Sequence, residues 1–330
     1  MANEVVLVVF VSFVVTLIAL FFARRILTAL DVVDVPNHRS SHSNTTLRGA
    51  GFAPLCGVIA GAVCSFFLGS SDFRILALVL VPAILVAIVG LIEDLHGLSM
   101  KARLLSQLVI GVLAGFMFNN SSAHPLVWMF FVTIGFAAYI NFTNFMDGVN
   151  GISGFHGIVV GLTFGYYGLT TSIVWLQTAG LIVSAVFLAF IPFNFRKPGM
   201  FLGDVGSYLL GGVIGAIAIS AFSNGIHWFA LLAPVSIYLT DTLFTIVSRK
   251  LAGESITEAH RSHIYQKLNK QGLTHLQVSL TVAAFTLASS LIGILFLRDI
   301  LDLSFSVILL ICTCILYIFL PLLRRRDFRG

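Results

Sequence analysis

Long apolar runs recur along the whole of this 330-residue chain, and they restrict the fold more than any other feature. The hydrocarbon core of a bilayer is about 30 Å thick and is crossed by about 20 helical residues. Because a helix satisfies its own backbone groups there, runs of this length predict membrane-spanning helices. We therefore expect an all-α, polytopic membrane protein with about eleven transmembrane helices in a single domain, residues 1–330. The expected helices are 5–22, 52–68, 75–92, 105–118, 126–140, 152–169, 173–193, 205–222, 226–247, 278–297 and 303–323.

The composition excludes a soluble globular fold. Hydrophobic residues make up 58% of the chain and charged residues 10%, with a mean hydropathy of +1.00. Soluble domains carry about 25% charged residues. Residues 1–22 lack the basic start and small-residue cleavage site of a signal peptide, so we expect the first helix to be retained. All four cysteines fall within expected helices, which indicates neither a disulfide framework nor a zinc site.

The basic residues are distributed asymmetrically between the two sides of the expected membrane domain. Lysine and arginine gather on the cytoplasmic side of membrane proteins. With the amino terminus outside, only Arg74 and Arg298 of the nineteen basic residues fall in outside segments, and the other seventeen fall inside. We therefore expect the amino terminus outside and the carboxyl terminus inside. The net charge of +5 then reflects topology and attraction to anionic lipid, and indicates no nucleic-acid surface.

Polar residues gather in the inside loops 31–51, 93–103, 141–151, 194–204 and 248–275, whereas the outside loops are short. The loop 141–151 reads N-F-T-N-F-M-D-G-V-N-G and places three asparagines, two glycines and Asp147 between apolar stretches. Burying a carboxylate costs free energy unless it meets a partner or water, so acids near the membrane are candidates for function. We call residues 141–151 the knot and expect it to belong to a site.

Further acids lie at expected helix boundaries on the same face. Glu93 and Asp94 end the third helix, and Asp204 precedes the eighth, beside Gly203 and Gly206. Mg²⁺ prefers one or two carboxylates together with waters and phosphate oxygens. Glycines at a helix start leave N–H groups open to phosphate. The pattern predicts an inner-face site for a phosphorylated substrate and a divalent cation.

Each of these features also has a structural interpretation. Asp204 alone is equally well explained as a helix N-cap, and Lys101 obeys the positive-inside rule without any further role. Asp241, within the ninth expected helix, faces either a substrate groove or a helix partner, and the sequence leaves both open. Four separate loops on one face, each with an acid or histidines beside glycine or amide residues, are not explained by solvation alone.

Five motifs occur in order along the chain. They are D-V-P-N-H-R-S-S-H at 34–42 with L-R-G-A-G at 47–51; G-L-I-E-D at 90–94 with L-S-M-K-A-R at 98–103; the knot; Asn194 with F-L-G-D-V-G-S at 201–207; and H-R-S-H-I-Y-Q-K-L at 260–268. Together they resemble the polyprenyl-phosphate N-acetylhexosamine-1-phosphate transferases (MraY/WecA-like, glycosyltransferase family 4), nearest to O-antigen-type initiating enzymes. The resemblance covers most of the chain.

The resemblance implies transfer of a sugar 1-phosphate from a UDP-sugar to undecaprenyl phosphate, which gives undecaprenyl-diphosphate-sugar and UMP. This would be the first membrane step of O-antigen or similar surface polysaccharide synthesis, at the cytoplasmic face of a bacterial inner membrane. The implied cofactor is Mg²⁺, with Mn²⁺ as an alternative. The implied partners are the donor, the acceptor and membrane lipid, with no nucleic acid, and a homodimer is left open.

The resemblance also implies roles for individual residues. Asp204 would be the metal ligand. Asp94 would position or deprotonate the lipid phosphate, and Lys101 would neutralise a phosphate, while the role of Glu93 is left open. The implied substrate-binding residues are Asn144, Asp147, Asn150 and Asn194 on the uridine side, and His260, Arg261 and His263 at the diphosphate or sugar. Whether a carboxylate attacks phosphorus to give a covalent intermediate is also left open.

The chain departs from the family pattern in three places. Glu93 replaces an aspartate that many relatives carry, Asn150 replaces an aspartate found in some, and the last motif lacks three adjacent histidines. The last two of these differences imply a UDP-N-acetylhexosamine or deoxy donor rather than the muramoyl-pentapeptide nucleotide. The alternative function is a polytopic transporter that uses intramembrane acids. Transporter sites lie near the middle of the membrane, whereas here the polar groups gather in inside loops.

Overall fold

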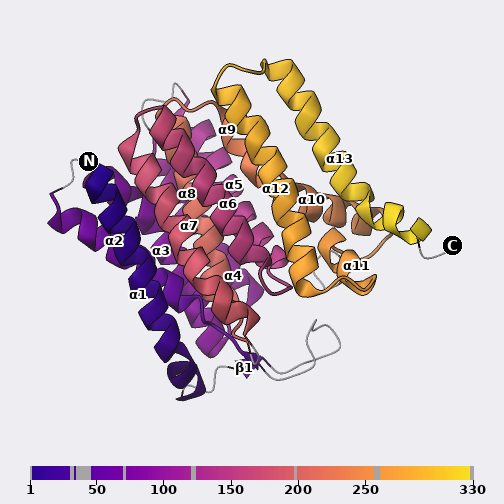
Figure 1. Ribbon diagram of the computed structural model, residues 1–330, viewed down its shortest axis with the longest axis horizontal. Helices are drawn as coiled ribbons and strands as arrows, with labels where there is room; N and C mark the ends of the chain where they lie inside the picture. The colour runs from indigo at the N-terminus through magenta and orange to yellow at the C-terminus, as the bar shows by residue number, and fades with distance from the viewer. Residues whose placement is uncertain are drawn as a thin grey trace.

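The computed structural model describes residues 2–29, 33–34, 46–69, 72–119, 124–196, 199–255 and 261–327. Long helices run side by side through one body, with α1 and α2 on one flank and α12 and α13 on the other (Figure 1). The long helices are α1 (Ala2–Ala29), α2 (Phe52–Phe67), α3 (Phe73–His96), α4 (Met100–Met117), α5 (Pro125–Met146), α6 (Ile152–Thr170), α7 (Val174–Phe195), α8 (Gly203–Ser223), α10 (Ser236–Leu251), α12 (His275–Leu297) and α13 (Leu303–Asp327).

The all-α, polytopic fold class is confirmed. Counting α9 (Trp228–Leu232) to α10 as one span, nine helices in the described ranges are long and apolar enough to cross a membrane. The sixteen-residue α2 is shorter, and α6 is not among the nine. Each of the eleven predicted segments overlaps helical residues of the structure. The number of membrane spans and the orientation of the two ends of the chain stay predictions.

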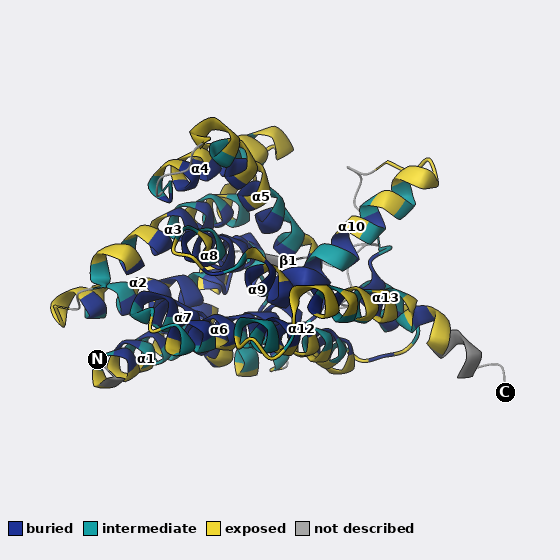
Figure 2. Ribbon diagram, turned by 90° about the horizontal axis from the view of Figure 1, so that it is seen from above, coloured by how far each residue is buried: buried dark blue, intermediate teal, exposed yellow. Residues whose placement is uncertain are grey.

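The predicted helix 226–247 is interrupted. The structure divides it into α9, a 3₁₀ turn η1 (Ala233–Val235) and α10. Pro234 lies in this turn, and proline removes a backbone donor and disfavours the helical ladder. After the break α10 extends away from the other helices, and its far end is exposed (Figure 2). The short helix α11 (Ile264–Lys270) then returns the chain to α12 and α13.

Helix α8 is the central helix of the body. It packs against α3 and α5, and most of its residues are buried. Small residues permit this approach: a Cβ atom on Gly211 would come within 2.7 Å of the Ile140 Cα atom, and one on Gly212 within 3.1 Å of the Ala83 Cα atom. Close backbone approach at glycine is a common way for membrane helices to pack. The carboxyl-terminal ends of α3 and α5 and the amino-terminal end of α8 therefore lie together.

A short irregular connection attaches the segment after α1 to the start of α8. The strands β1 (Val33–Asp34) and β2 (Thr46–Leu47) pair antiparallel, and Leu47 also forms a parallel bridge with Met200. The N–H group of Gly51 donates to the carbonyl oxygen of Leu202 at 2.8 Å. A Cβ atom at Gly51 would lie 2.3 Å from the Gly206 Cα atom, so only glycine fits there. This contact places Arg48 at the first turn of α8.

Candidate active site

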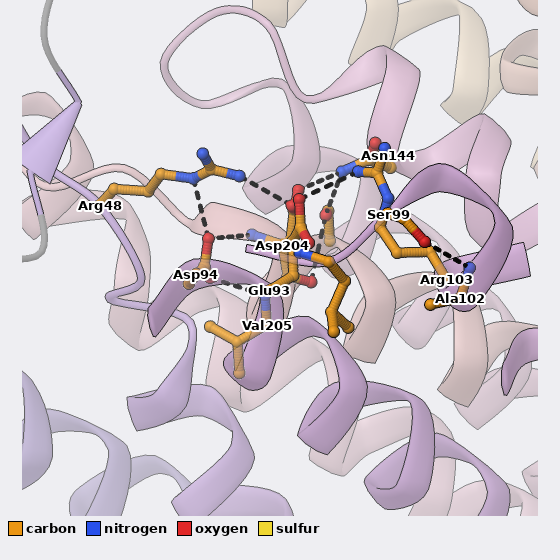
Figure 3. Close-up of polar contacts among 11 residues, drawn as sticks. Arg48, Glu93, Asp94, Ser99, Ala102, Arg103, Asn144, Asp204 and Val205 are labelled. Carbon is orange, nitrogen blue, oxygen red and sulfur yellow. Dashed lines mark hydrogen bonds and ion pairs between the residues drawn. The ribbon is translucent and has the colours of Figure 1, made fainter. Parts of the chain in front are cut away.

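Two carboxylates converge on one guanidinium where the last turn of α3 meets the first turn of α8. Arg48 Nε lies 2.8 Å from Asp94 Oδ1, and Arg48 NH2 lies 2.7 Å from Asp204 Oδ2. The aspartate side chains are 1% and 9% exposed, whereas the arginine side chain is 37% exposed. In Figure 3, Arg48 approaches the two acids from one side and Asn144 approaches Asp204 from the other. The buried acids are therefore held together by a cation that water can reach.

Asp94 also forms the cap of α8. It accepts the backbone N–H groups of Asp204 at 3.1 Å and Val205 at 2.9 Å. The first N–H groups of a helix have no partner within it, and a carboxylate satisfies them well. Gly203 has a φ of +74°, and a Cβ atom there would meet Asp94 Oδ2 at 2.5 Å. The N-cap position belongs to Leu202, so Asp204 lies in the first turn and its carboxylate faces Arg48 and Asn144.

Asn144 completes the environment of Asp204. Its Nδ2 group donates to Asp204 Oδ1 at 2.6 Å and to Ser207 Oγ at 3.0 Å. Both oxygens of Asp204 therefore accept from nitrogen donors, one charged and one neutral. Asn144 was predicted to bind the uridine side of the donor. In the structure its amide contacts Asp204, the predicted metal ligand.

Glu93, adjacent to Asp94, contacts the connection between α3 and α4. It accepts the backbone N–H of Leu98 and lies 3.3 Å from Arg103 NH1. Ser99 caps α4 in the same connection. Glu93 thus orients this turn, and Lys101 lies on the first turn of α4 with an exposed side chain. Glu93 forms an ion pair with Arg103, whereas Arg48 pairs with Asp94 and Asp204.

Asn150 and Asn194, two other predicted substrate residues, hold the knot in place. Asn150 Nδ2 donates to the Asn194 carbonyl oxygen at 2.8 Å, and Asn194 Oδ1 accepts the Gly151 N–H. Asn194 Nδ2 donates to the Met200 carbonyl oxygen at 2.9 Å. Gly151 has a φ of +89°, which glycine adopts without strain. These amides connect the knot to the segment that leads into α8.

Asp147 lies in the knot between α5 and α6, and it is partly buried. Burial raises the pKa of its carboxyl to about 7, and the negative charges of Asp204 and Asp94 act in the same direction, while Arg48 opposes them. Because this pKa is higher in the folded protein than the ordinary 3.8, the ionised group destabilises the fold at high pH. The destabilisation is absent below the unfolded pKa and complete above the folded one.

We expect Asp147→Asn to raise the melting temperature at about pH 8.5 relative to the parent protein, with a gain that shrinks as the pH falls through about 7. The substitution removes the ionisation but keeps the size of the side chain. Thermal unfolding of purified protein in detergent at about pH 5 and about pH 8.5 measures the gain. Asp299→Asn, at an exposed acid, is the control and should show no such pH-dependent gain. An equal gain from Asp147→Asn at both pH values would contradict the assignment.

The last inside motif is only partly described. His260 lies outside the described residues. Arg261 and His263 precede α11, and His263 is buried with its Nδ1 atom 2.9 Å from Asp241 Oδ1. Asp241 also accepts the N–H groups of Ile264 and Tyr265. Of the two alternatives left open for Asp241, the structure therefore selects contact with protein partners.

Sequence reasoning did not assign a role to Arg48. It lies in the L-R-G-A-G segment, and the signal that could have identified it is a basic residue beside glycines that approach another backbone. Its partner Asp204 is 156 positions away along the chain. A pairing at that separation has no local sequence pattern.

The oxygen atoms of Asp94 and Asp204 are the candidate donors for the predicted metal. Within the described part of the chain, no group of three or more histidine, cysteine or acidic side chains could hold a metal ion. Mg²⁺ does not require such a cage, because one or two carboxylates suffice when waters and substrate phosphates supply the remaining oxygens. The adjacent oxygens of Asp94 and Asp204, already gathered around a cation, fit that donor set.

An apolar cavity of about 390 Å³ lies between α5, α8, α9 and α10. Its lining includes Trp128, Phe136, Ile219, Leu231 and Leu239, and it contains no charged side chain. In the lining, Tyr139 lies within two helical turns of Asn144 on α5. Leu239 lies within one turn of Asp241 on α10. The cavity therefore reaches toward Asn144 along α5 and toward Asp241 along α10.

The chain is similar to known sugar 1-phosphate transferases. Residues 76–222 match the model of Glycosyl transferase family 4. A probable undecaprenyl-phosphate N-acetylglucosaminyl 1-phosphate transferase of Bacillus subtilis (strain 168) is 27% identical over 298 residues, covering 83% of this chain and 81% of that protein. The undecaprenyl-phosphate alpha-N-acetylglucosaminyl 1-phosphate transferase of Escherichia coli (strain K12) is 28% identical over 313 residues, covering 86% and 81%. A phospho-N-acetylmuramoyl-pentapeptide-transferase of Streptococcus sanguinis is 26% identical over 266 residues, covering 70% and 77%.

Proposed function

Since the chain belongs to glycosyl transferase family 4, among its MraY/WecA-like members, we propose that it transfers a sugar 1-phosphate from a UDP-sugar to undecaprenyl phosphate. The products are undecaprenyl-diphosphate-sugar and UMP. The proposed sugar is an N-acetylhexosamine or a deoxy relative, and the product would begin a surface polysaccharide such as O-antigen. The observation that carries the proposal is the pairing of Asp94 and Asp204 through Arg48 at the N-terminus of α8.

The reaction joins two anionic phosphate groups, and the site offers means to offset their repulsion. An oxygen of the lipid phosphate attacks the β-phosphorus of the donor, and the bond from that phosphorus to the UMP oxygen breaks. Arg48 is exposed enough to reach a phosphate, and guanidinium pairs with phosphate through two parallel hydrogen bonds. The positive end of the α8 dipole adds to this attraction.

Asp94 is proposed to orient the lipid phosphate or to take its proton. The second pKa of a phosphate monoester is about 6, so the acceptor is largely ionised near neutral pH. Orientation is then the larger contribution. Asp94 suits this because contacts to Arg48 and to the first N–H groups of α8 fix its carboxylate.

Asp204, with Asp94 beside it, would hold Mg²⁺ or alternatively Mn²⁺. When bound, such an ion neutralises diphosphate charge and acts as a Lewis acid. Arg48 and Asn144 hold the Asp204 carboxylate from opposite sides and so fix its direction. In this proposal Lys101 lies at the rim of the site and neutralises a substrate phosphate.

The two substrates are assigned to different parts of the site. The knot, with Asp147, Asn150 and Asn194, is proposed to receive the uridine side of the donor, and His260, Arg261 and His263 its diphosphate or sugar. The apolar cavity between α5 and α9 is proposed to receive the first isoprene units of the acceptor, since it is apolar and reaches toward Asn144. The phosphate of the lipid would then lie at Arg48.

The proposed location is the bacterial inner membrane, with the site on the cytoplasmic face. The support is the distribution of basic residues, of which only Arg74 and Arg298 fall outside. A peptide tag after the carboxyl terminus is expected to be digested by protease only after the inner membrane of spheroplasts is opened. Digestion of the tag in intact spheroplasts would reverse the proposed orientation.

The reaction is tested with purified protein, undecaprenyl phosphate, Mg²⁺ and a panel of UDP-sugars. UMP release that needs both substrates is the expected result, and the active donor identifies the sugar. Reactions without acceptor measure background hydrolysis. If no donor gives acceptor-dependent UMP, the transferase proposal fails, and solute uptake into proteoliposomes would then support the transporter alternative.

A further inference from the structure

Asp241 is a fully buried carboxylate that the proposed chemistry does not use. Its Oδ1 atom accepts from His263 Nδ1 at 2.9 Å and from the Ile264 N–H at 3.0 Å. Its Oδ2 atom accepts from the Tyr265 N–H at 3.2 Å and from the Tyr317 hydroxyl at 2.7 Å. One side chain on α10 therefore connects the start of α11 and the middle of α13.

These contacts determine where α11 lies. The helix has only seven residues, and an isolated helix that short does not form in water. The first backbone N–H groups of α11 have no partner within the helix. The Asp241 carboxylate, on α10, accepts those of Ile264 and Tyr265. A carboxylate is suited to this position because all the contacts of Asp241 given above, and that of the Thr245 hydroxyl at 3.5 Å, bring a donor to one of its oxygens. An amide would turn N–H groups toward some of them.

Helix α11 in turn contacts the knot. The Tyr265 hydroxyl donates to the carbonyl oxygen of Phe145 at 3.0 Å, and a Cβ atom on Gly148 would lie 2.1 Å from that hydroxyl. The rings of Phe145 and His263 are 6.5 Å apart. Phe145 directly follows Asn144, which donates to Asp204. A continuous set of contacts therefore runs from Asp241 through Tyr265 to the knot.

We propose that Asp241 is a positioning residue that holds His263 and α11 against the knot and thereby sets the affinity for the donor without touching it. The proposal rests on the proposed function for the assignment of the knot to the donor. Tyr317 extends the same role to α13, so the carboxyl-terminal helix contributes to a site that it does not line.

The test compares Asp241→Asn, Tyr317→Phe and a control, Thr242→Val, which changes the adjacent buried residue on α10. The KM for the UDP-sugar should rise about tenfold or more in Asp241→Asn and less in Tyr317→Phe, because Asp241→Asn weakens every contact to the carboxylate whereas Tyr317→Phe removes only one of them. The KM for undecaprenyl phosphate should change less than about twofold in either. Thr242→Val should match the parent protein, and Asp241→Glu should recover part of the donor affinity.

Equal increases in both KM values, or an unchanged donor KM in Asp241→Asn, would overturn the proposal. Amide hydrogen exchange of the parent protein and Tyr317→Phe supplies a readout that needs no turnover. Faster exchange is expected in both 264–270 and 143–151. Acceleration confined to 264–270 would show that α11 does not hold the knot.

Hydrogen exchange tests the positioning role of Asp241 independently of the transferase function. The result can be interpreted even if no donor releases UMP. If Asp241→Asn does not fold, Tyr265→Phe takes its place, since it keeps the carboxylate but removes the hydroxyl contact to Phe145. Faster exchange of 143–151 in that variant supports the contact path, and unchanged exchange overturns it.

Discussion

Asp204→Asn is expected to abolish turnover, with a loss of about a thousandfold or more in kcat, while the protein remains folded in the membrane. Asn keeps the shape of the side chain and can still accept from one nitrogen. It removes the negative charge that pairs with Arg48 at 2.7 Å and that would bind the metal ion. Because Asp204 is 9% exposed, bulk water does not replace the lost carboxylate.

The measurement for Asp204→Asn is UMP release over a titration of Mg²⁺, with thermal unfolding as the check on folding. Asp299→Asn, which also removes one negative charge but at an exposed position, should keep the parent activity and the parent Mg²⁺ dependence. Near-normal turnover of Asp204→Asn with an unchanged Mg²⁺ requirement would remove Asp204 as the metal ligand.

Arg48→Met is expected to lower kcat/KM by a factor of about a hundred to a thousand. Methionine fills much of the same volume but leaves Asp94 and Asp204 adjacent without their shared cation. The two acids are almost completely buried, so their mutual repulsion is weakly screened. Arg48→Lys should recover only part of the activity, because an ammonium cannot bridge two carboxylates with the geometry of a guanidinium.

Arg103→Met is the matched control for Arg48→Met. Arg103 also pairs with an acid, but the distance to Glu93 Oε1 is 3.3 Å, and the Glu93 side chain is 14% exposed, more than that of Asp94 or Asp204. Pairs of this kind contribute little, so a small loss is expected. If Arg103→Met lost as much activity as Arg48→Met, a general loss of positive charge near the site would explain both losses. The pairing of Arg48 with Asp94 and Asp204 would then not be the cause.

The sequence predicted the helices well because long apolar runs leave a membrane chain few alternatives. Every predicted helix has a counterpart, and the acids at the ends of α3 and α8 do come together. It did not predict the break at Pro234. Pro82 and Pro192 lie inside continuous helices of the same structure, so proline within an apolar run does not by itself predict an interruption.

The contacts of the site were less predictable than its members. Asp94 and Asp204 carried local signals, since each is an acid at the end of an apolar run. The partner of Asp241 could not be identified because α11 is seven residues long and is held by tertiary contacts to α10 and α13. Similarly, nothing near Asn144 indicates that its amide contacts a residue 60 positions away. The substrate roles of these residues stay predictions.

The contact between Asp94 and the first turn of α8 spans 110 positions of the chain, and this separation has a consequence during synthesis. At about 5 to 20 residues per second, a ribosome needs roughly 5 to 20 seconds to make the intervening segment. Throughout that interval α3 has been inserted, but its terminal carboxylate has neither of its α8 donors. A charge in mid-membrane would hinder insertion of the helix that carries it. At the end of α3 the carboxylate can stay hydrated until α8 emerges, so the nascent chain can be inserted helix by helix before Asp94 meets the first turn of α8.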